Sequence, residues 1–332
     1  MNTLDRRRFC AALATLSATP LFAGQAFGQS QSATATPAKV PATAAAKTGA
    51  YPSVIGQLQR HVTRYEDSLV DLARSYNLGY IEMVAANPGI DPWVPGADVE
   101  VVIPTLHIVP DGAREGLLLN LSDQRLYWFR PDGKTVSSVP VGVGDEGWKT
   151  PKGATKIVRK QANPTWHVPK SVLEEDPTIP KIVPPGPDNP LGTHALYLGW
   201  PAYLIHGTNK PFGVGRRVSH GCVRLYPEDI ARLFPQIPVG TPVTVVDQEI
   251  KVARMAGQLW VEIHPSQAQA VELEQDGKFT PAKPPEFEFR ILQAAGDDRK
   301  LIDWEKAKSA AIERRGVPVP ILKTTVAATS KG

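Results

Sequence analysis

One stretch decides the fold of this 332-residue chain: His206-Gly207-Thr208-Asn209-Lys210-Pro211-Phe212-Gly213, continued by Ser219-His220-Gly221-Cys222-Val223-Arg224-Leu225. It contains two of the seven histidines and one of the two cysteines. Imidazole can be a base toward a thiol or a positive neighbour of a thiolate, so the stretch predicts a reactive cysteine. Gly221 and Cys222 also place consecutive backbone N–H groups beside the sulfur, where an oxyanion would form.

The pattern HGT-x-x-P-F-G followed by SHGCVRL is similar to the signature of the YkuD-type L,D-transpeptidases, the penicillin-insensitive enzymes that remodel peptidoglycan. The resemblance implies that Cys222 is the acyl-enzyme nucleophile and that His206 is its general base. It also implies that the backbone carbonyl of Gly207 orients His206. His220 is a competing base, because residues 220 and 222 of an extended segment point to the same face.

Other residues of the stretch are candidates for the same site. Ser219 either hydrogen-bonds a histidine or caps the turn, and Arg224 holds either a stem-peptide carboxylate or a structural acid. Asn209 and Gly213 are predicted to contact the substrate. We expect no cofactor and no metal.

Three rival interpretations stay open. His206, His220 and Cys222 contain ligand types that zinc accepts, so a metal site is one alternative. A papain- or NlpC-like hydrolase is a second, although those families place the cysteine before the histidine in the chain. The third is a non-catalytic scaffold that only binds the cell wall.

Residues 1–28 are predicted to be a secretory signal, with Arg6-Arg7-Arg8-Phe9 as the charged region before a short apolar stretch. Asp5 and these residues resemble a twin-arginine motif, which predicts a periplasmic protein exported by that route; a general secretory signal is the alternative. The apolar stretch is too short and too rich in Ala, Ser and Thr to span a bilayer. We therefore expect no membrane span in the mature protein.

Removal of the signal changes both charge and cysteine count. Three arginines and one aspartate leave with it, so the formal net charge falls from +4 to +2. A charge this small, without a basic run, argues against nucleic acid as a partner. Cys10 also leaves, and Cys222 becomes an unpaired thiol in an exported protein. Nucleophilic catalysis explains such a thiol, with an inert buried cysteine as the alternative.

Four further regions are predicted. Residues 29–60 are expected to be a flexible linker, since their first part is Ala, Thr, Ser, Pro, Gln and Lys with almost no large apolar side chain. Residues 61–105 have a βααβ order and resemble a LysM module, which implies glycan binding; a scaffold unit packed on the catalytic domain is the alternative. Residues 115–247 are predicted to be the catalytic domain and residues 248–332 a C-terminal accessory subdomain, with an amphipathic helix over 299–315.

The fold class that these features predict is mostly β, α+β, with a β-sandwich-like catalytic domain as the resemblance implies. Short apolar or alternating runs predict its strands, one of them over 136–143. Thr150-Pro151-Lys152-Gly153 resembles a turn of the transpeptidase family. Residues 163–192 hold eight prolines and include Pro184-Pro185-Gly186-Pro187-Asp188-Asn189-Pro190, so we expect a substrate-covering flap or, alternatively, a surface excursion.

The order of module, catalytic domain and extension resembles the enterobacterial periplasmic L,D-transpeptidases, including those that anchor Braun lipoprotein. The implied partners are peptidoglycan stem peptides and glycan. Acyl acceptors would be a diaminopimelate amine, a lysine of a Braun-type lipoprotein, or water, which would make the enzyme an L,D-carboxypeptidase. A lone exposed thiolate is prone to sulfenic acid, so a periplasmic thiol reductase is a further predicted partner.

Overall fold

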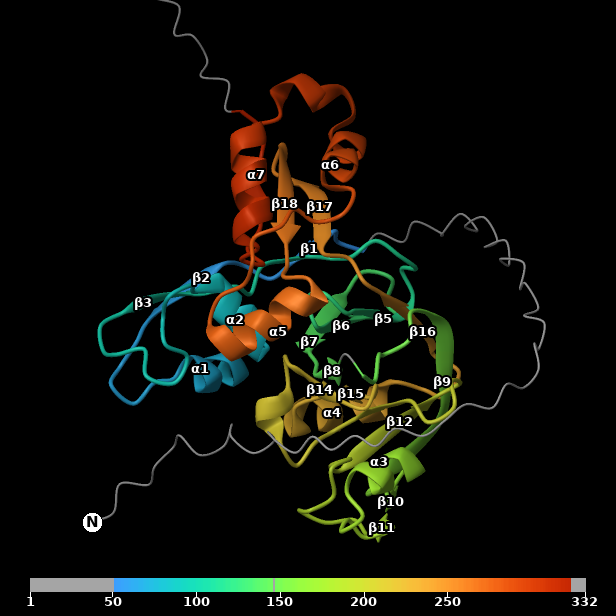
Figure 1. Ribbon diagram of the computed structural model, residues 1–332. Helices are drawn as coiled ribbons and strands as arrows, with labels where there is room; N and C mark the ends of the chain where they lie inside the picture. Colours follow the sequence, from blue (N-terminus) through green and yellow to red (C-terminus); the bar gives the residue numbers. More distant parts are fainter. Residues whose placement is uncertain (1–50, 146, 324–332) are drawn as a thin grey trace, which may run out of the picture. The chain divides into compact units, whose positions relative to one another are not determined.

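Residues 51–145 and 147–323 are described by the computed structural model of the chain (Figure 1). The predicted signal at 1–28 and residues 29–50 of the predicted linker lie outside the described residues. The linker prediction is wrong for residues 51–60. Strand β1 (Val54–Ile55) pairs antiparallel with β4 (His107–Ile108), and β2 (Gln59–Val62) begins inside this range. The partner of β1 lies far away in the sequence, so local composition does not reveal it.

An N-terminal module follows, formed by β2, α1 (Leu69–Ser75), α2 (Tyr80–Ala86) and β3 (Glu100–Ile103). Strands β2 and β3 pair antiparallel. Helix α1 begins at Ser68, whose hydroxyl accepts a hydrogen bond from the N–H of Asp71 at 3.0 Å and so satisfies one of the free donors of the first turn. The two helices and β3 enclose a small apolar core of Leu69, Leu72, Ala73, Leu78, Met83, Val101 and Ile103.

The catalytic domain is built on a mixed eight-stranded sheet in the order β15-β13-β12-β9-β16-β5-β6-β7. Its strands are β5 (Gly116–Asn120), β6 (Arg125–Phe129), β7 (Val136–Pro140), β9 (Gly153–Ala162), β12 (His194–Leu198), β13 (Leu204–His206), β15 (Val223–Arg224) and β16 (Pro242–Val246). Strand β9 is long enough to serve two neighbours: its first half pairs with β16 and its second half with β12.

Both halves of this sheet contribute to one core. Leu117 and Trp128 come from β5 and β6, whereas Leu196 and Ile205 come from β12 and β13. Helix α4 (Pro227–Leu233) adds Ile230 and Leu233 to the same cluster. Two sheet halves that face a shared apolar layer form a sandwich-like arrangement, and the mostly β, α+β prediction is confirmed.

Two predicted elements differ in detail. The strand expected over 136–143 is divided into β7 and β8 (Val143–Gly144), because β8 leaves β6 and pairs in parallel with β14 (Arg217–Ser219). The proline-rich segment, expected to be a substrate-covering flap or a surface excursion, contains three short elements and is called the flap below. In it α3 (Lys170–Glu175) lies between β10 (Trp166–His167) and β11 (Ile182–Val183), which pair antiparallel.

The C-terminal subdomain has a three-stranded sheet of β17 (Ile250–Met255), β18 (Gln258–Ile263) and β19 (Val319–Pro320). Helices α5 (Gln267–Asp276), α6 (Phe287–Ala295) and α7 (Trp304–Glu313) accompany it. The helix predicted over 299–315 begins later, at Trp304, because Asp303 caps it; residues 296–301 form a 3₁₀ helix. Within the described ranges, every helix is too short or too polar to cross a bilayer.

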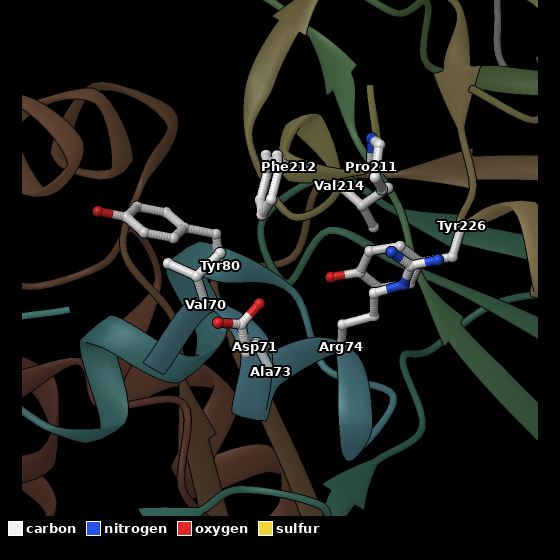
Figure 2. A pocket seen from close by; sticks show the side chains of 9 residues that line it. All are labelled: Val70, Asp71, Ala73, Arg74, Tyr80, Pro211, Phe212, Val214 and Tyr226. Atoms are coloured by element: carbon white, nitrogen blue, oxygen red, sulfur yellow. The ribbon is translucent and has the colours of Figure 1, made fainter. Parts of the chain in front are cut away.

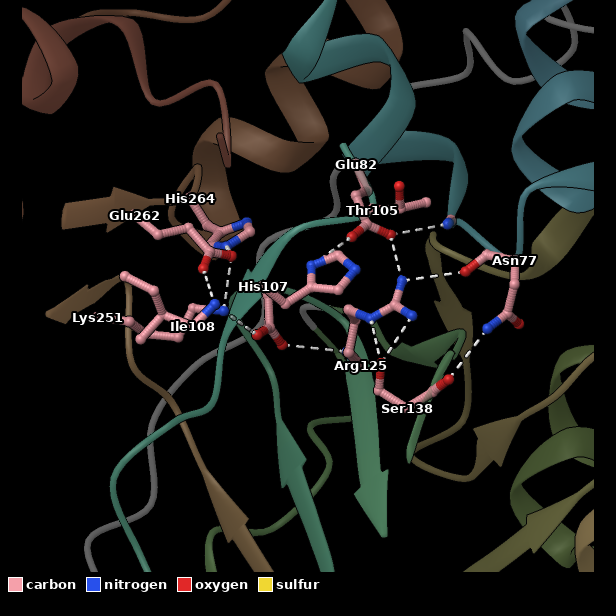
Figure 3. A network of polar contacts seen from close by, with 12 residues as sticks. Asn77, Glu82, Thr105, His107, Ile108, Arg125, Ser138, Lys251, Glu262 and His264 are labelled. Carbon is pink, nitrogen blue, oxygen red and sulfur yellow. Dashed lines mark hydrogen bonds and ion pairs between the residues drawn. The ribbon is translucent and has the colours of Figure 1, made fainter. Parts of the chain in front are cut away.

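A buried polar cluster joins the module, the catalytic sheet and the C-terminal subdomain (Figure 3). On the module side, Glu82 of α2 receives Arg125 of β6 at 2.8 Å and lies 3.4 Å from Nδ1 of His107. All three side chains are buried. Burial raises the pKa of Glu82 although Arg125 opposes the shift, and burial with Arg125 and Lys251 nearby holds the pKa of His107 well below its usual range.

On the subdomain side of the cluster, the ammonium of Lys251 contacts Asp123 at 2.8 Å and Glu262 at 2.7 Å. Glu262 also lies 2.7 Å from Nε2 of His264 and accepts the backbone N–H of Ile108. Burial lowers the pKa of Lys251, but the two carboxylates raise it by more, so the net shift is upward. The cluster therefore consists of paired charges whose partners come from different parts of the chain.

Candidate active site

Strands β13 and β15 bring the two key residues together. They pair in parallel, with Ile205 opposite Val223 and His206 opposite Arg224. Ile205 and Val223 point into the core, so alternation turns His206, Arg224 and Cys222 to the other face. Cys222 precedes β15 by one residue, which places its Cα diagonally from that of His206, at roughly 8 Å from standard sheet spacings. An imidazole can span most of that distance.

His206 is buried and held by its own neighbour. Its Nδ1 lies 2.6 Å from the carbonyl oxygen of Gly207, so this nitrogen carries the proton and donates. The other ring nitrogen, Nε2, is then the one with the lone pair. Burial, together with the charge of Arg224, lowers the pKa of His206 to about 4. At neutral pH the ring is uncharged and can accept a proton.

Cys222 is half-buried, and its thiol faces the carbonyl of Ala202 at 3.6 Å. Burial raises the pKa of the thiol, although a hydrogen bond from the backbone of Leu204 and the charge of Arg224 favour the thiolate. Burial therefore favours the neutral form of both the Cys222 thiol and the His206 imidazole.

The turn between Ser219 and Cys222 is fixed by short polar contacts. The hydroxyl of Ser219 donates to the carbonyl of Cys222 at 2.6 Å, so Ser219 caps the turn in this structure. Thr150 accepts from the N–H of Gly144 at 3.1 Å and donates to the carbonyl of Gly221 at 2.9 Å. Gly221 has φ +92°, and a Cβ there would lie 2.7 Å from the Tyr203 ring, so both conformation and space require glycine.

His220 turns away from a base role toward the flap. Its Nε2 lies 2.9 Å from one carboxylate oxygen of Glu175 in α3, and its ring is 5.3 Å from that of Trp148. The indole N–H of Trp148 donates to the other oxygen of Glu175 at 3.1 Å. The structure thus places His220 beside the site, with its ring nitrogen engaged by an acid from another segment.

Arg224 is a half-buried cation close to the thiol. Burial lowers its pKa, while Cys222 acts in the opposite direction. Among the described residues, Cys222 and no carboxylate acts on the pKa of Arg224, and both alternatives for this arginine stay predictions. Gly213 lies at the edge of this region: a Cβ there would come 3.7 Å from the guanidinium. Asn209 is exposed in the loop after β13.

The loop that carries Asn209 and Gly213 is supported by the N-terminal module. Figure 2 shows a small pocket in which Pro211, Phe212 and Val214 of the loop, with Tyr226, face module residues. Its other lining residues are Val70, Asp71, Ala73, Arg74 and Tyr80. The loop and the module are also joined through their backbones, since the N–H of Ile81 donates to the carbonyl of Gly215 at 3.1 Å.

No group of three or more histidine, cysteine, aspartate or glutamate side chains in residues 51–145 and 147–323 is arranged to hold a metal ion. His206 is turned to Gly207, and His220 to Glu175.

Three residues beside the cysteine had no site role in the sequence-based prediction: Glu175, Trp148 and Thr150. Thr150 had a signal, since it begins the turn that resembles one of the transpeptidase family. Glu175 and Trp148 had none, because their contact with His220 depends on how the flap folds back.

A half-buried cysteine beside a neutral, oriented imidazole in a sandwich-like domain is typical of enzymes that transfer acyl groups through a thioester. Comparison with known proteins identifies the family. Residues 114–245 match the YkuD model, described as an L,D-transpeptidase catalytic domain. The chain belongs to this family and is an L,D-transpeptidase.

The similarity extends beyond that domain. Probable L,D-transpeptidase ErfK/SrfK of Escherichia coli is 38% identical over 260 residues, covering 76% of this chain and 82% of that protein. Probable L,D-transpeptidase YcfS of the same organism is 35% identical over 283 residues, or 82% of this chain and 86% of its own length. Probable L,D-transpeptidase YbiS is 42% identical over 199 residues, 58% of this chain and 64% of that protein.

Proposed function

We propose that this L,D-transpeptidase works on peptidoglycan stem peptides in the periplasm, with Cys222 as nucleophile and His206 as general base. The observation that supports this assignment is the orientation of His206. Its Nδ1 donates to the carbonyl of Gly207, which leaves Nε2 with the lone pair, and strand alternation turns His206 and Cys222 to the same sheet face.

The first half-reaction is acylation. The Cys222 thiol turns from the Ala202 carbonyl, its proton passes to Nε2 of His206, and the sulfur attacks the carbonyl carbon at the L centre of diaminopimelate in a tetrapeptide stem. The bond to the terminal D-Ala breaks, and the imidazolium returns the proton to the leaving amine. The product is a thioester and free D-Ala.

A neutral pair suits this step. Because burial raises the thiol pKa and lowers that of His206, a preformed thiolate–imidazolium pair is disfavoured before substrate arrives. Proton transfer therefore accompanies attack, and His206 acts as a base in the transition state. His220, bound to Glu175, is left to shape the site.

The backbone around the cysteine suits an oxyanion. In the described part of the chain, no protein acceptor takes the N–H groups of Gly221 or Cys222, while Thr150 and Ser219 fix their carbonyls. Donors held in place before the reaction stabilise charge that develops on the carbonyl oxygen. Arg224, a half-buried cation whose charge acts on the thiol, would bind a stem-peptide carboxylate, and Asn209 and Gly213 would contact the stem from the loop.

The second half-reaction transfers the acyl group to an amine. A diaminopimelate amine would give a 3–3 crosslink, and a lysine amine of a Braun-type lipoprotein would give an anchor. Water would give L,D-carboxypeptidase activity. The LysM-like module would contribute glycan binding, and a periplasmic thiol reductase would keep Cys222 reduced after export by the twin-arginine route.

The test uses the mature protein and Cys222→Ala, each incubated with a disaccharide-tetrapeptide and a lysine-ended peptide. Mass spectrometry follows the protein adduct and the products. We expect a thioester adduct and D-Ala release from the wild type only, with dimer, lysine conjugate or tripeptide naming the acceptor. Folded, reduced wild type that forms no adduct and releases no D-Ala would overturn the proposal in favour of a wall-binding scaffold.

A further inference from the structure

The flap is fixed at its base. Asn189, fully buried, donates through its side-chain amide to the carbonyls of Pro164, Val183 and Pro184 at 2.8, 3.2 and 3.1 Å. Its amide oxygen accepts the N–H of Leu191 at 2.9 Å. One side chain thus ties the start of the proline-rich segment to its end, where prolines leave few backbone donors.

The tip of the flap is held differently. Apart from Val172, which is buried, α3 is largely exposed, and Glu175 links it to residues near Cys222 by hydrogen bonds. The two oxygens of this carboxylate are divided between two partners: Nε2 of His220 at 2.9 Å and Nε1 of Trp148 at 3.1 Å. His220 is two residues from Cys222, and Trp148 lies in the loop before β9.

We propose that Glu175 is a positioning residue that latches the flap over Cys222 by bridging His220 and Trp148. This inference rests on the proposed function, since it assigns the flap to control of access to the nucleophile. The latch has to release for a stem peptide to enter and to re-form around the bound donor.

The latch is weak enough to open. Its acid and imidazole are 51% and 38% exposed, and exposed ion pairs contribute little because water competes for them. The rigid part of the device is the Asn189 base, and the reversible part is the Glu175 tip. Loss of the carboxylate should therefore change site access by a small factor and leave folding intact.

The test measures two rates on reduced protein: alkylation of Cys222 by iodoacetamide, and acylation by a disaccharide-tetrapeptide. For Glu175→Ala we expect alkylation about two- to fivefold faster and the KM for the donor raised by a similar factor, with kcat changed less. The alkylation rate and KM of Glu175→Gln should lie between those of the wild type and Glu175→Ala. The amide oxygen of glutamine can accept from only one of the two donors, His220 or Trp148, while its NH₂ group faces the other. A melting temperature equal to that of the wild type shows that the change is local.

Glu174→Gln is the matched control, because it removes the same charge from the adjacent, 64% exposed residue of α3. It should leave both rates unchanged. Unchanged alkylation and unchanged KM in Glu175→Ala would overturn the latch, as would an equal change in Glu174→Gln. If the wild type is alkylated but never acylated, the proposed function fails, while the alkylation series still decides the latch.

Discussion

Two of the buried histidines, in different parts of this molecule, differ in what surrounds them. His206 and His107 are both 3% exposed, both have a pKa lowered by burial, and both have an arginine nearby. His107 faces the carboxylate of Glu82 within a cluster of paired charges. Nδ1 of His206 donates to the carbonyl of Gly207, and the residue lies on the same sheet face as the half-buried Cys222.

The comparison shows what burial does in each region. In the buried polar cluster of Figure 3, the junction between the module, the catalytic sheet and the C-terminal subdomain, buried charges pair with partners from separate segments. Removal of one partner would leave an uncompensated buried charge. In the site, burial favours the neutral forms of Cys222 and His206, which the proposed proton transfer requires. Substitution of Cys222 should therefore change activity more than stability, and substitution of a charge in the buried cluster should do the reverse.

The largest effect is expected from Cys222→Ala. Acyl transfer should fall at least about a thousandfold, because the variant lacks the nucleophile of the proposed mechanism. The free energy of unfolding should change by less than about 1 kcal/mol, since the side chain is only half-buried. Mass spectrometry of released products measures the activity, and urea unfolding measures the stability. Activity near that of the wild type would contradict the role proposed for Cys222.

Lys251→Met should show the opposite pattern. It removes the cation from two buried carboxylates, and we expect a loss of about 3–5 kcal/mol in the free energy of unfolding with activity per folded molecule retained. Chemical denaturation measures the loss. Lys308→Met, at an exposed pair on α7, is the control and should be within about 0.5 kcal/mol of the wild type. Equal stability of the two variants would contradict our account of the junction.

The pH dependence of acylation should reflect the low pKa of His206. The base is functional when neutral, so kcat/KM should hold down to about pH 5 and fall about tenfold per unit below pH 4. Between about pH 6.5 and 4 the unfolded chain binds a proton at this histidine and the folded chain does not, so stability also declines as pH falls through this window.

Arg224→Gln sharpens the pH prediction. The arginine is the second cause of the low His206 pKa, after burial, so its loss should move the acid limb upward by up to about one pH unit. A limb that stays in place in this variant would show that Arg224 does not act on His206.

The smallest effect on activity is expected at Thr150, whose hydroxyl holds the turn before Cys222. Thr150→Val leaves the Gly144 N–H and the Gly221 carbonyl without a side-chain partner in a buried place. We expect a loss of about 1–3 kcal/mol in the free energy of unfolding, with some loss of activity as the turn loosens. Thr150→Ser keeps the hydroxyl and should restore most of both; a failure to do so would show that the methyl group, not the bond, is what matters.

Much of this arrangement could be predicted from sequence, because it is local. The placement of His206 at the end of a strand, the glycine-rich turn before Cys222 and the order of β and α elements all follow from patterns of a few residues. The family follows from the fixed residue types of one stretch, and its assignment is confirmed by the comparisons.

What could not be predicted depends on distant pairing. Glu175 meets His220 only because the flap folds back over the site, and β1 is a strand only because β4 pairs with it. The charged residues of the junction belong to types that usually lie on the surface, so the sequence gives no sign that they are buried. They become buried partners only when separate segments fold together. Helix α7 begins at Trp304 because Asp303 supplies a cap that hydrophobic spacing does not locate.

The contact between Gly79 and Gly215 has a consequence for how such chains can be recombined. A Cβ on Gly79 would lie 2.7 Å from the Cα of Gly215, and Gly215 itself has φ +75°. Two main chains that pack this closely leave no room for a side chain at either position, so the two segments have to match each other in shape. A chimera that takes its N-terminal module from an unrelated wall protein would also need the matching loop from that protein. The module and the loop around Phe212 should therefore be exchanged together.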